Sequence, residues 1–200
     1  MRINLPTWLT LFRVLLLPVM VLVFYSHDAI NAIPLRFANV AAVAVFALAS
    51  LTDWLDGWIA RRWHMESAFG AFLDPVADKL MMAVALFLLV QSHPTWLLAV
   101  TSAVIVGREI TVSALREWMA FVGERTRVNV MWIGKIKTVM QIVALLVLLT
   151  QHDAPVLRVY HIGEGLLVIA AVLTIWSGLA YLRAAWPVLR VDSPREGSGP

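Results

Sequence analysis

The chain alternates between long apolar stretches and short polar breaks. Six stretches each come close to the roughly 20 residues that an α-helix needs to cross a bilayer. They cover residues 6–25, 35–59, 72–90, 95–120, 130–149 and 164–185. Polar or turn-forming residues interrupt them at 26–28, 61–70, 92–94, 123–127 and 151–155. The pattern predicts six transmembrane helices with short connections between them.

Composition strengthens this prediction. Hydrophobic residues make up 60% of the chain and charged residues 14%, against about 45–50% and 25% in a typical soluble domain. This excludes a soluble nucleic-acid-binding protein, a disordered regulator and a coiled coil. The chain has no cysteine, which excludes disulfides and thiolate metal sites. We expect an all-α polytopic membrane protein with one domain over residues 1–190, followed by a disordered tail over 191–200.

Lysine and arginine are unevenly distributed between the two predicted sides of the membrane. If the N-terminus is cytoplasmic, the outer loops contain only Arg36 and Arg158 of the 16 basic residues. Cytoplasmic loops of membrane proteins carry an excess of basic residues. Both termini are therefore predicted to be cytoplasmic.

Charged residues also occur inside the predicted helices, near their cytoplasmic ends. The outer halves of the first five helices are free of charge, and so is residue range 165–182 in the sixth. The inner halves contain Arg13, Asp53, Asp56, Asp74, Asp78, Lys79, Arg108, Glu109, Arg116, Lys135 and Lys137. Because each charge in hydrocarbon costs at least about 2.5–3.5 kcal/mol, we expect a polar cavity open to the cytoplasm. The alternative is that the helices end earlier and these charges lie in solvated loops.

Two aspartates share one face of the second predicted helix. At 100° per residue, Asp53, Asp56, Gly57 and Ala60 fall within about 100° of one another. The small residues Gly57 and Ala60 leave room beside the carboxylates for a nucleotide, and Arg61 can neutralise a diphosphate.

A second pair of aspartates follows. Asp74 and Asp78 are one helical turn apart, and we expect them at the start of the third helix. There Pro75 would be tolerated, because the N–H groups of a first turn have no helical partner. The intervening loop lets the two helices run antiparallel, so that the two pairs of carboxylates face each other.

Four carboxylates this close would repel one another unless cations neutralise them. Oxygen ligands select Mg²⁺, Mn²⁺ or Ca²⁺, and four aspartates suit a two-metal site that holds a phosphate or diphosphate. Helix capping and ion conduction are the alternatives for these residues.

The spacing of these residues resembles the signature of the CDP-alcohol phosphotransferase family. The matching positions are Asp53, Asp56, Gly57, Ala60, Arg61, Gly70, Asp74 and Asp78. The similarity extends over nearly the whole chain, to about Ala185. One departure is Thr7, where the wider family often has asparagine after the proline.

The resemblance implies a reaction and a set of site residues. Two Mg²⁺ or Mn²⁺ ions would be held by Asp53, Asp56, Asp74 and Asp78, and Asp78 would also act as general base. The acceptor oxygen would attack the β-phosphorus of CDP-diacylglycerol and release CMP. The nucleotide would lie against Thr7, Thr10, Gly57, Ala60, Arg61, Ser67 and Gly70. The resemblance also implies a homodimer in the bacterial cytoplasmic (inner) membrane.

A basic set further along the chain bears on the acceptor. Arg108, Arg116, Lys135 and Lys137 suit a phosphate, which favours glycerol 3-phosphate over serine. The alternative explanation for these residues is the general excess of lysine and arginine on the cytoplasmic side of membrane proteins, which does not depend on a substrate. Glu109 is expected to pair with one of these bases, because a lone buried carboxylate is unfavourable; Arg13 fits either role.

Rival functions make different demands on the sequence. Inositol phosphate, serine and phosphatidylglycerol are alternative acceptors within the family. A membrane prenyltransferase also uses aspartates and Mg²⁺, but it needs more spans. A transporter or channel would have charges that are accessible from both sides of the membrane, whereas the outer halves of these helices contain no charged residues.

Overall fold

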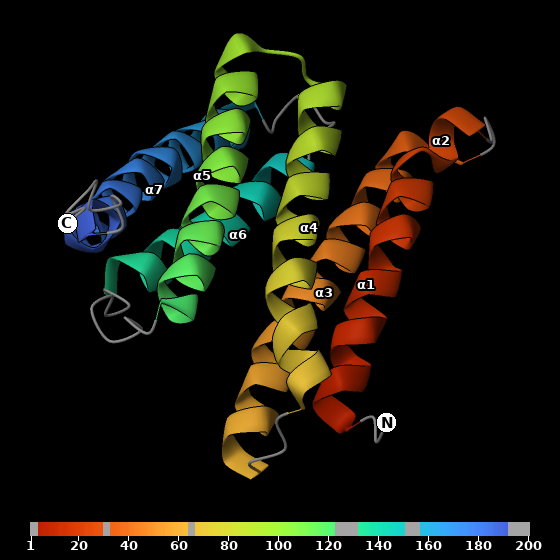
Figure 1. Cartoon of the computed structure of the whole chain (residues 1–200). Helices are drawn as coiled ribbons and strands as arrows, with labels where there is room; N and C mark the ends of the chain where they lie inside the picture. The colour runs from red at the N-terminus through yellow and green to blue at the C-terminus, as the bar shows by residue number, and fades with distance from the viewer. Residues whose placement is uncertain (1–3, 30–32, 64–66, 123–131, 151–156, 192–200) are drawn as a thin grey trace, which may run out of the picture.

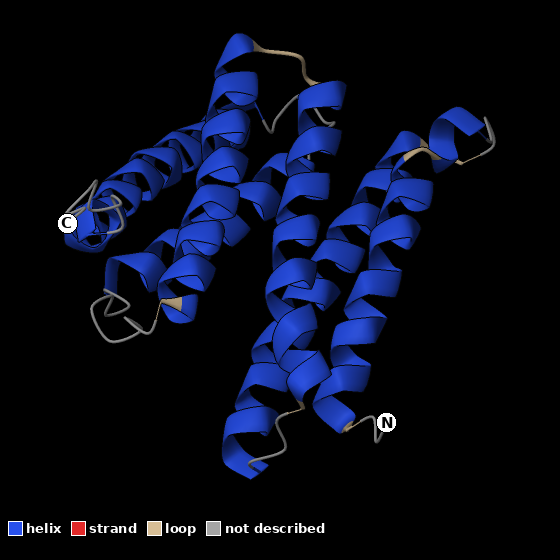
Figure 2. Ribbon diagram, in the orientation of Figure 1, coloured by secondary structure: helices blue, strands red, loops and turns tan. Residues whose placement is uncertain are grey.

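The computed structural model describes residues 4–29, 33–63, 67–122, 132–150 and 157–191. Within these ranges the chain is helical and contains no strand (Figure 2). The helices are α1 (Leu5–Phe24), α2 (Ser26–Ala29), α3 (Leu35–Trp63), α4 (Ala68–Ser92), α5 (Trp96–Phe121), α6 (Trp132–Leu149) and α7 (Leu157–Val191). Each of the six apolar stretches lies largely or wholly within one long helix, which confirms the all-α prediction for the described residues. The short helix α2 has no counterpart in the prediction.

The charged inner halves are helical and do not lie in loops. Helix α3 continues to Trp63, beyond Asp53 and Asp56, and α5 continues to Phe121, beyond Arg108 and Arg116. The alternative that these helices end before their charges is therefore wrong.

Helix α4 begins earlier than predicted. The Ser67 side chain accepts a hydrogen bond from the Gly70 N–H at 2.9 Å and caps the helix, which satisfies an N–H that would otherwise have no helical partner. Asp74, Pro75 and Asp78 consequently lie inside α4, so the prediction that Pro75 occupies the first turn is wrong. Proline has no N–H, so the carbonyl of Ala71 loses its usual helical donor.

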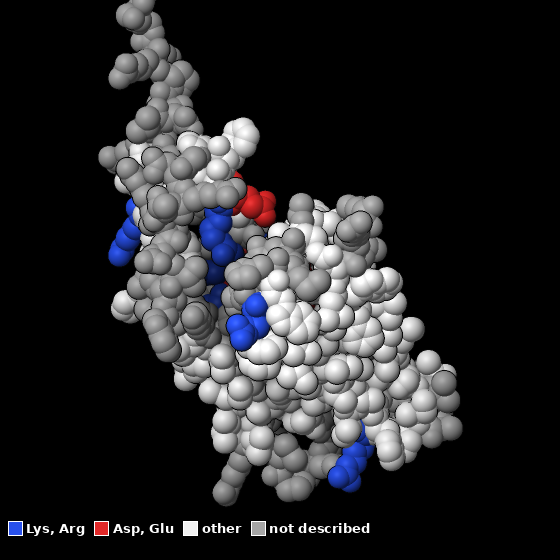
Figure 3. Space-filling view, turned by 90° about the horizontal axis from the view of Figure 1, so that it is seen from below, with Lys and Arg blue, Asp and Glu red and all other residues white. Residues whose placement is uncertain are grey.

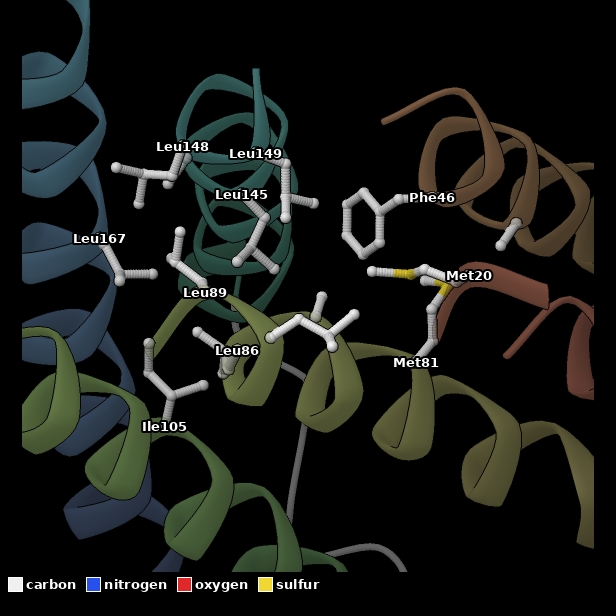
Figure 4. Packing of buried hydrophobic residues seen from close by; sticks show 14 of the residues in the cluster. Met20, Phe46, Met81, Leu86, Leu89, Ile105, Leu145, Leu148, Leu149 and Leu167 are labelled. Atoms are coloured by element: carbon white, nitrogen blue, oxygen red, sulfur yellow. The ribbon is translucent and has the colours of Figure 1, made fainter. Parts of the chain in front are cut away.

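The long helices form two groups, which are joined by α4 and by the contact of α3 with α6 (Figure 1). Helix α1 packs against α3 and α4, while α7 packs against α5 and α6, and α4 also contacts α5 and α6. One apolar core connects the groups (Figure 4). Its fully buried side chains include Met20, Phe46, Leu86, Ile105, Leu145 and Leu167.

Among the residues that the structure describes, four helices are long and apolar enough to cross a membrane by length and composition. They cover Leu5–Phe24, Leu35–Ile59, Trp96–Phe121 and Val159–Pro187. Large apolar side chains such as Leu22, Phe37 and Phe87 are 63–70% exposed, as expected for a surface that contacts lipid. The chain is thus a helical membrane protein.

Candidate active site

The guanidinium of Arg13 lies at the centre of the acidic site. Arg13 belongs to α1 and is completely buried. Its Nη1 donates to Oδ1 of Asp78 at 2.6 Å and lies 2.9 Å from Oδ1 of Asp53. Its Nη2 donates to Oδ2 of Asp56. One cation from α1 therefore joins two carboxylates of α3 to one of α4.

The fourth aspartate is held by the same face of α1. The Thr10 hydroxyl donates to Oδ1 of Asp74. Thr10 and Arg13 are three residues apart and Asp74 and Asp78 are four apart, so each pair lies along one side of its helix. The structure thus brings all four predicted aspartates to the region where α1, α3 and α4 meet.

These carboxylates differ in exposure. The side chains of Asp53 and Asp78 are 42% and 45% exposed, whereas that of Asp56 is only 5% exposed. Asp56 is therefore the carboxylate most dependent on Arg13 for charge compensation. Asp53 and Asp78 remain accessible to a substrate or a cation.

Three of the predicted nucleotide-binding residues meet next to the aspartates. Thr7 and Ser67 share a hydrogen bond of 2.7 Å between their hydroxyl oxygens. A Cβ atom at Gly70 would lie 2.9 Å from each of these oxygens, so any larger residue would require these hydroxyls to move where α1 approaches α4.

The remaining nucleotide candidates are on α3. Gly57 is half-buried on that helix. Ala60 and Arg61 belong to the same helix, but their side chains lie outside the described residues.

A cavity of about 460 Å³ adjoins the acidic site and connects it to the basic set. Its lining includes Asp53 from α3, Arg108 and Arg116 from α5, and Lys137 from α6. The side chain of Lys135 lies outside the described residues. In Figure 3, lysine and arginine side chains extend into a hollow on the face seen from below. The structure therefore places three of the four predicted acceptor residues around one cavity.

Glu109 is paired, as the sequence predicts. It forms an ion pair with Lys137 and lies 3.5 Å from Nη1 of Arg108. With one carboxylate against Arg108, Arg116 and Lys137, this wall of the cavity carries excess positive charge.

Sequence reasoning missed several contacts. It left the role of Arg13 open, although the three-residue spacing of Thr7, Thr10 and Arg13 already places them on one face of α1. It also gave no role to Ser177 or Tyr181 of α7, which contact Arg108.

The donor set of the acidic site fits divalent cations chemically. All four acidic groups are carboxylates, the ligand type that Mg²⁺ and Mn²⁺ prefer, and three of them gather on one positive charge. Arg13 supplies that charge here. Among the residues that the structure describes, no three acidic or histidine side chains are arranged to hold a metal ion by themselves.

An acidic site next to a basic cavity in a helical membrane protein is an arrangement that can bind phosphate groups together with cations. Residues 3–176 match the family model for CDP-alcohol phosphatidyltransferase, and the chain belongs to this family.

Individual members of the family are similar over nearly the full length. Proteins of Escherichia coli K12, Sodalis glossinidius and Shigella flexneri serotype 5b are each 49% identical over 185 residues. The matched region is 92% of this chain and 96% of each relative. All three relatives are named CDP-diacylglycerol–glycerol-3-phosphate 3-phosphatidyltransferase.

Proposed function

We propose that this protein transfers the phosphatidyl group of CDP-diacylglycerol to glycerol 3-phosphate, giving phosphatidylglycerophosphate and CMP. One observation carries the proposal: Asp53 of the acidic site lines the same cavity as Arg108, Arg116 and Lys137. A diphosphate at the aspartates and a phosphate-bearing alcohol at the basic wall would be neighbours there. The similar proteins named for this reaction support the assignment.

The acidic site would bind the diphosphate with the help of divalent ions. Asp53, Asp56, Asp74 and Asp78 would hold two Mg²⁺ or Mn²⁺ ions. Such ions neutralise a diphosphate and polarise its phosphorus.

Asp78 is the proposed general base, since its side chain is 45% exposed and its carboxylate is therefore open to a substrate hydroxyl. It takes the proton of the acceptor hydroxyl. The oxygen then attacks the β-phosphorus, and the bond from phosphorus to CMP breaks.

The two substrates would bind on different walls. The cytidine nucleotide would lie against Thr7, Thr10, Gly57, Ala60, Arg61, Ser67 and Gly70. The phosphate of the acceptor would be bound by Arg108, Arg116, Lys135 and Lys137. Arginine provides paired donors for phosphate oxygens and lysine a compact charge.

The proposed membrane arrangement has six spans, including α4 and α6, with the cavity open to the cytoplasm. Both termini would lie in the cytoplasm, residues 1–190 would form one domain, and residues 191–200 a disordered tail. We place the protein in the bacterial inner membrane as a homodimer. The uneven distribution of basic residues supports this orientation.

Purified protein in detergent is expected to release CMP from CDP-diacylglycerol when glycerol 3-phosphate is the acceptor. Serine and phosphatidylglycerol are expected to give little or no CMP, because neither offers a free phosphomonoester to the basic wall. Inositol phosphate does carry one, and little CMP is expected from it because the similar proteins are named for glycerol 3-phosphate. Turnover with one of these alcohols and none with glycerol 3-phosphate would refute the assignment.

Removal of divalent ions is expected to stop the reaction reversibly. Without added cations, the carboxylates repel the negatively charged diphosphate. CMP release is measured in excess chelator and again after Mg²⁺ or Mn²⁺ is restored. Continued turnover in excess chelator contradicts a metal-dependent site.

A further inference from the structure

Arg108 is held in place by α7. Its Nε donates to the carbonyl oxygen of Thr174 at 3.0 Å, and its Nη2 donates to Oγ of Ser177 at 2.7 Å. Its Cζ lies 5.6 Å from the centre of the Tyr181 ring, within the range of a cation–π interaction. Two of the three guanidinium nitrogens are thus bonded to α7.

The Ser177 hydroxyl is itself oriented. It donates to the carbonyl oxygen of Thr174 at 3.0 Å, so its proton is engaged and a lone pair is available to Arg108. Thr174 and Ser177 are both buried, which favours one arrangement of these hydrogen bonds.

Gly178 provides the space in which the arginine crosses α7. A Cβ atom at this position would lie 3.2 Å from Cγ and 3.4 Å from Nε of Arg108, closer than optimal contact between such atoms. A Cβ atom at Gly165, on the same helix, would meet no neighbouring segment within 4 Å among the described residues. The absence of a side chain at Gly178 therefore has a specific steric consequence for Arg108.

We propose that Thr174, Ser177, Gly178 and Tyr181 position Arg108 for the phosphate of the acceptor. This inference rests on the proposed function, in which Arg108 binds that phosphate. An arginine that α7 has already oriented loses less conformational entropy on binding than a free one. The match to the family model covers residues 3–176. Ser177, Gly178 and Tyr181 come after this region in the chain, and Thr174 lies within it.

The inference can be tested with Gly178→Ala and the matched control Gly165→Ala. Alanine forms helices better than glycine, so neither change should weaken α7 through its backbone. In Gly178→Ala the added methyl group forces Arg108 to shift by a few tenths of an ångström, and we expect the KM for glycerol 3-phosphate to rise about tenfold. The kcat at saturating acceptor and the KM for CDP-diacylglycerol should stay within about twofold of the control.

A second pair of variants tests the hydroxyl. Ser177→Ala removes the acceptor of the Arg108 hydrogen bond and should raise the KM for glycerol 3-phosphate. Ser177→Thr keeps a hydroxyl, so its KM for glycerol 3-phosphate should lie close to that of the unmodified protein. Ser102→Ala is the control, because Ser102 is a buried serine of α5 whose hydroxyl has no partner among the described residues.

The outcomes separate this inference from the proposed function. If the unmodified protein does not use glycerol 3-phosphate, the proposed function fails. If it does, and Gly178→Ala has the same acceptor KM as Gly165→Ala, only the positioning role is rejected. An equal rise in the KM for both substrates also rejects it, because general damage to the fold would produce that result.

Discussion

Asparagine in place of Asp78 is expected to reduce turnover by about 10²- to 10⁴-fold, the usual contribution of a general base. Its side-chain oxygen can still accept the hydrogen bond that Asp78 receives from Nη1 of Arg13 at 2.6 Å. The amide cannot take a proton from the acceptor hydroxyl. The change should therefore slow the chemical step and leave the packing of α1 against α4 intact.

Two measurements check this expectation. CMP release reports turnover, and calorimetry in detergent reports binding of CDP-diacylglycerol, which should be largely retained. Glu117→Gln is a matched control, since Glu117 is an exposed acidic residue on α5. Near-normal turnover in Asp78→Asn would refute the role of Asp78 as base.

Methionine in place of Arg13 is expected to destabilise the protein by about 3–5 kcal/mol, as found when one partner of a buried ion pair is removed. The main cause is Asp56, whose side chain is only 5% exposed and would lose its neighbouring cation. Asp53 and Asp78 can gain hydration because each is more than two-fifths exposed. Turnover should be lost as well, because three carboxylates of the site would separate.

Thermal unfolding in detergent, followed by tryptophan fluorescence, measures the loss of stability. Arg13→Lys should unfold at a temperature between those of Arg13→Met and the unmodified protein. Lysine keeps the positive charge but lacks the forked guanidinium that reaches several carboxylates. Arg62→Met is the control, because Arg62 is exposed near the end of α3. Unfolding of Arg13→Met at the temperature of the unmodified protein would contradict a central role for this ion pair.

Much of the fold could be predicted from hydrophobic periodicity. The six apolar stretches correspond to α1 and α3–α7 because burial in lipid or in the core needs continuous apolar surface. The start of α4 could not be placed, since the Ser67 cap depends on a local hydrogen bond to Gly70. That error put Asp74 and Asp78 at a helix end instead of inside a helix.

The acidic site could be predicted only in part. The spacing of Asp53 and Asp56 along α3, and of Asp74 and Asp78 along α4, follows from helix geometry alone. The contact of Arg13 with three of these residues does not, because it depends on how α1 packs against both helices.

The sequence by itself determined the helical membrane class, the four aspartates and the basic set, since these follow from composition and from spacing along single helices. The tertiary structure alone decided which charges meet. It placed Arg13 among the aspartates and placed Arg108 against Ser177 of α7, far away in the chain. The physical reason is that ion pairs and hydrogen bonds between helices depend on helix rotation and distance, which local sequence patterns do not specify.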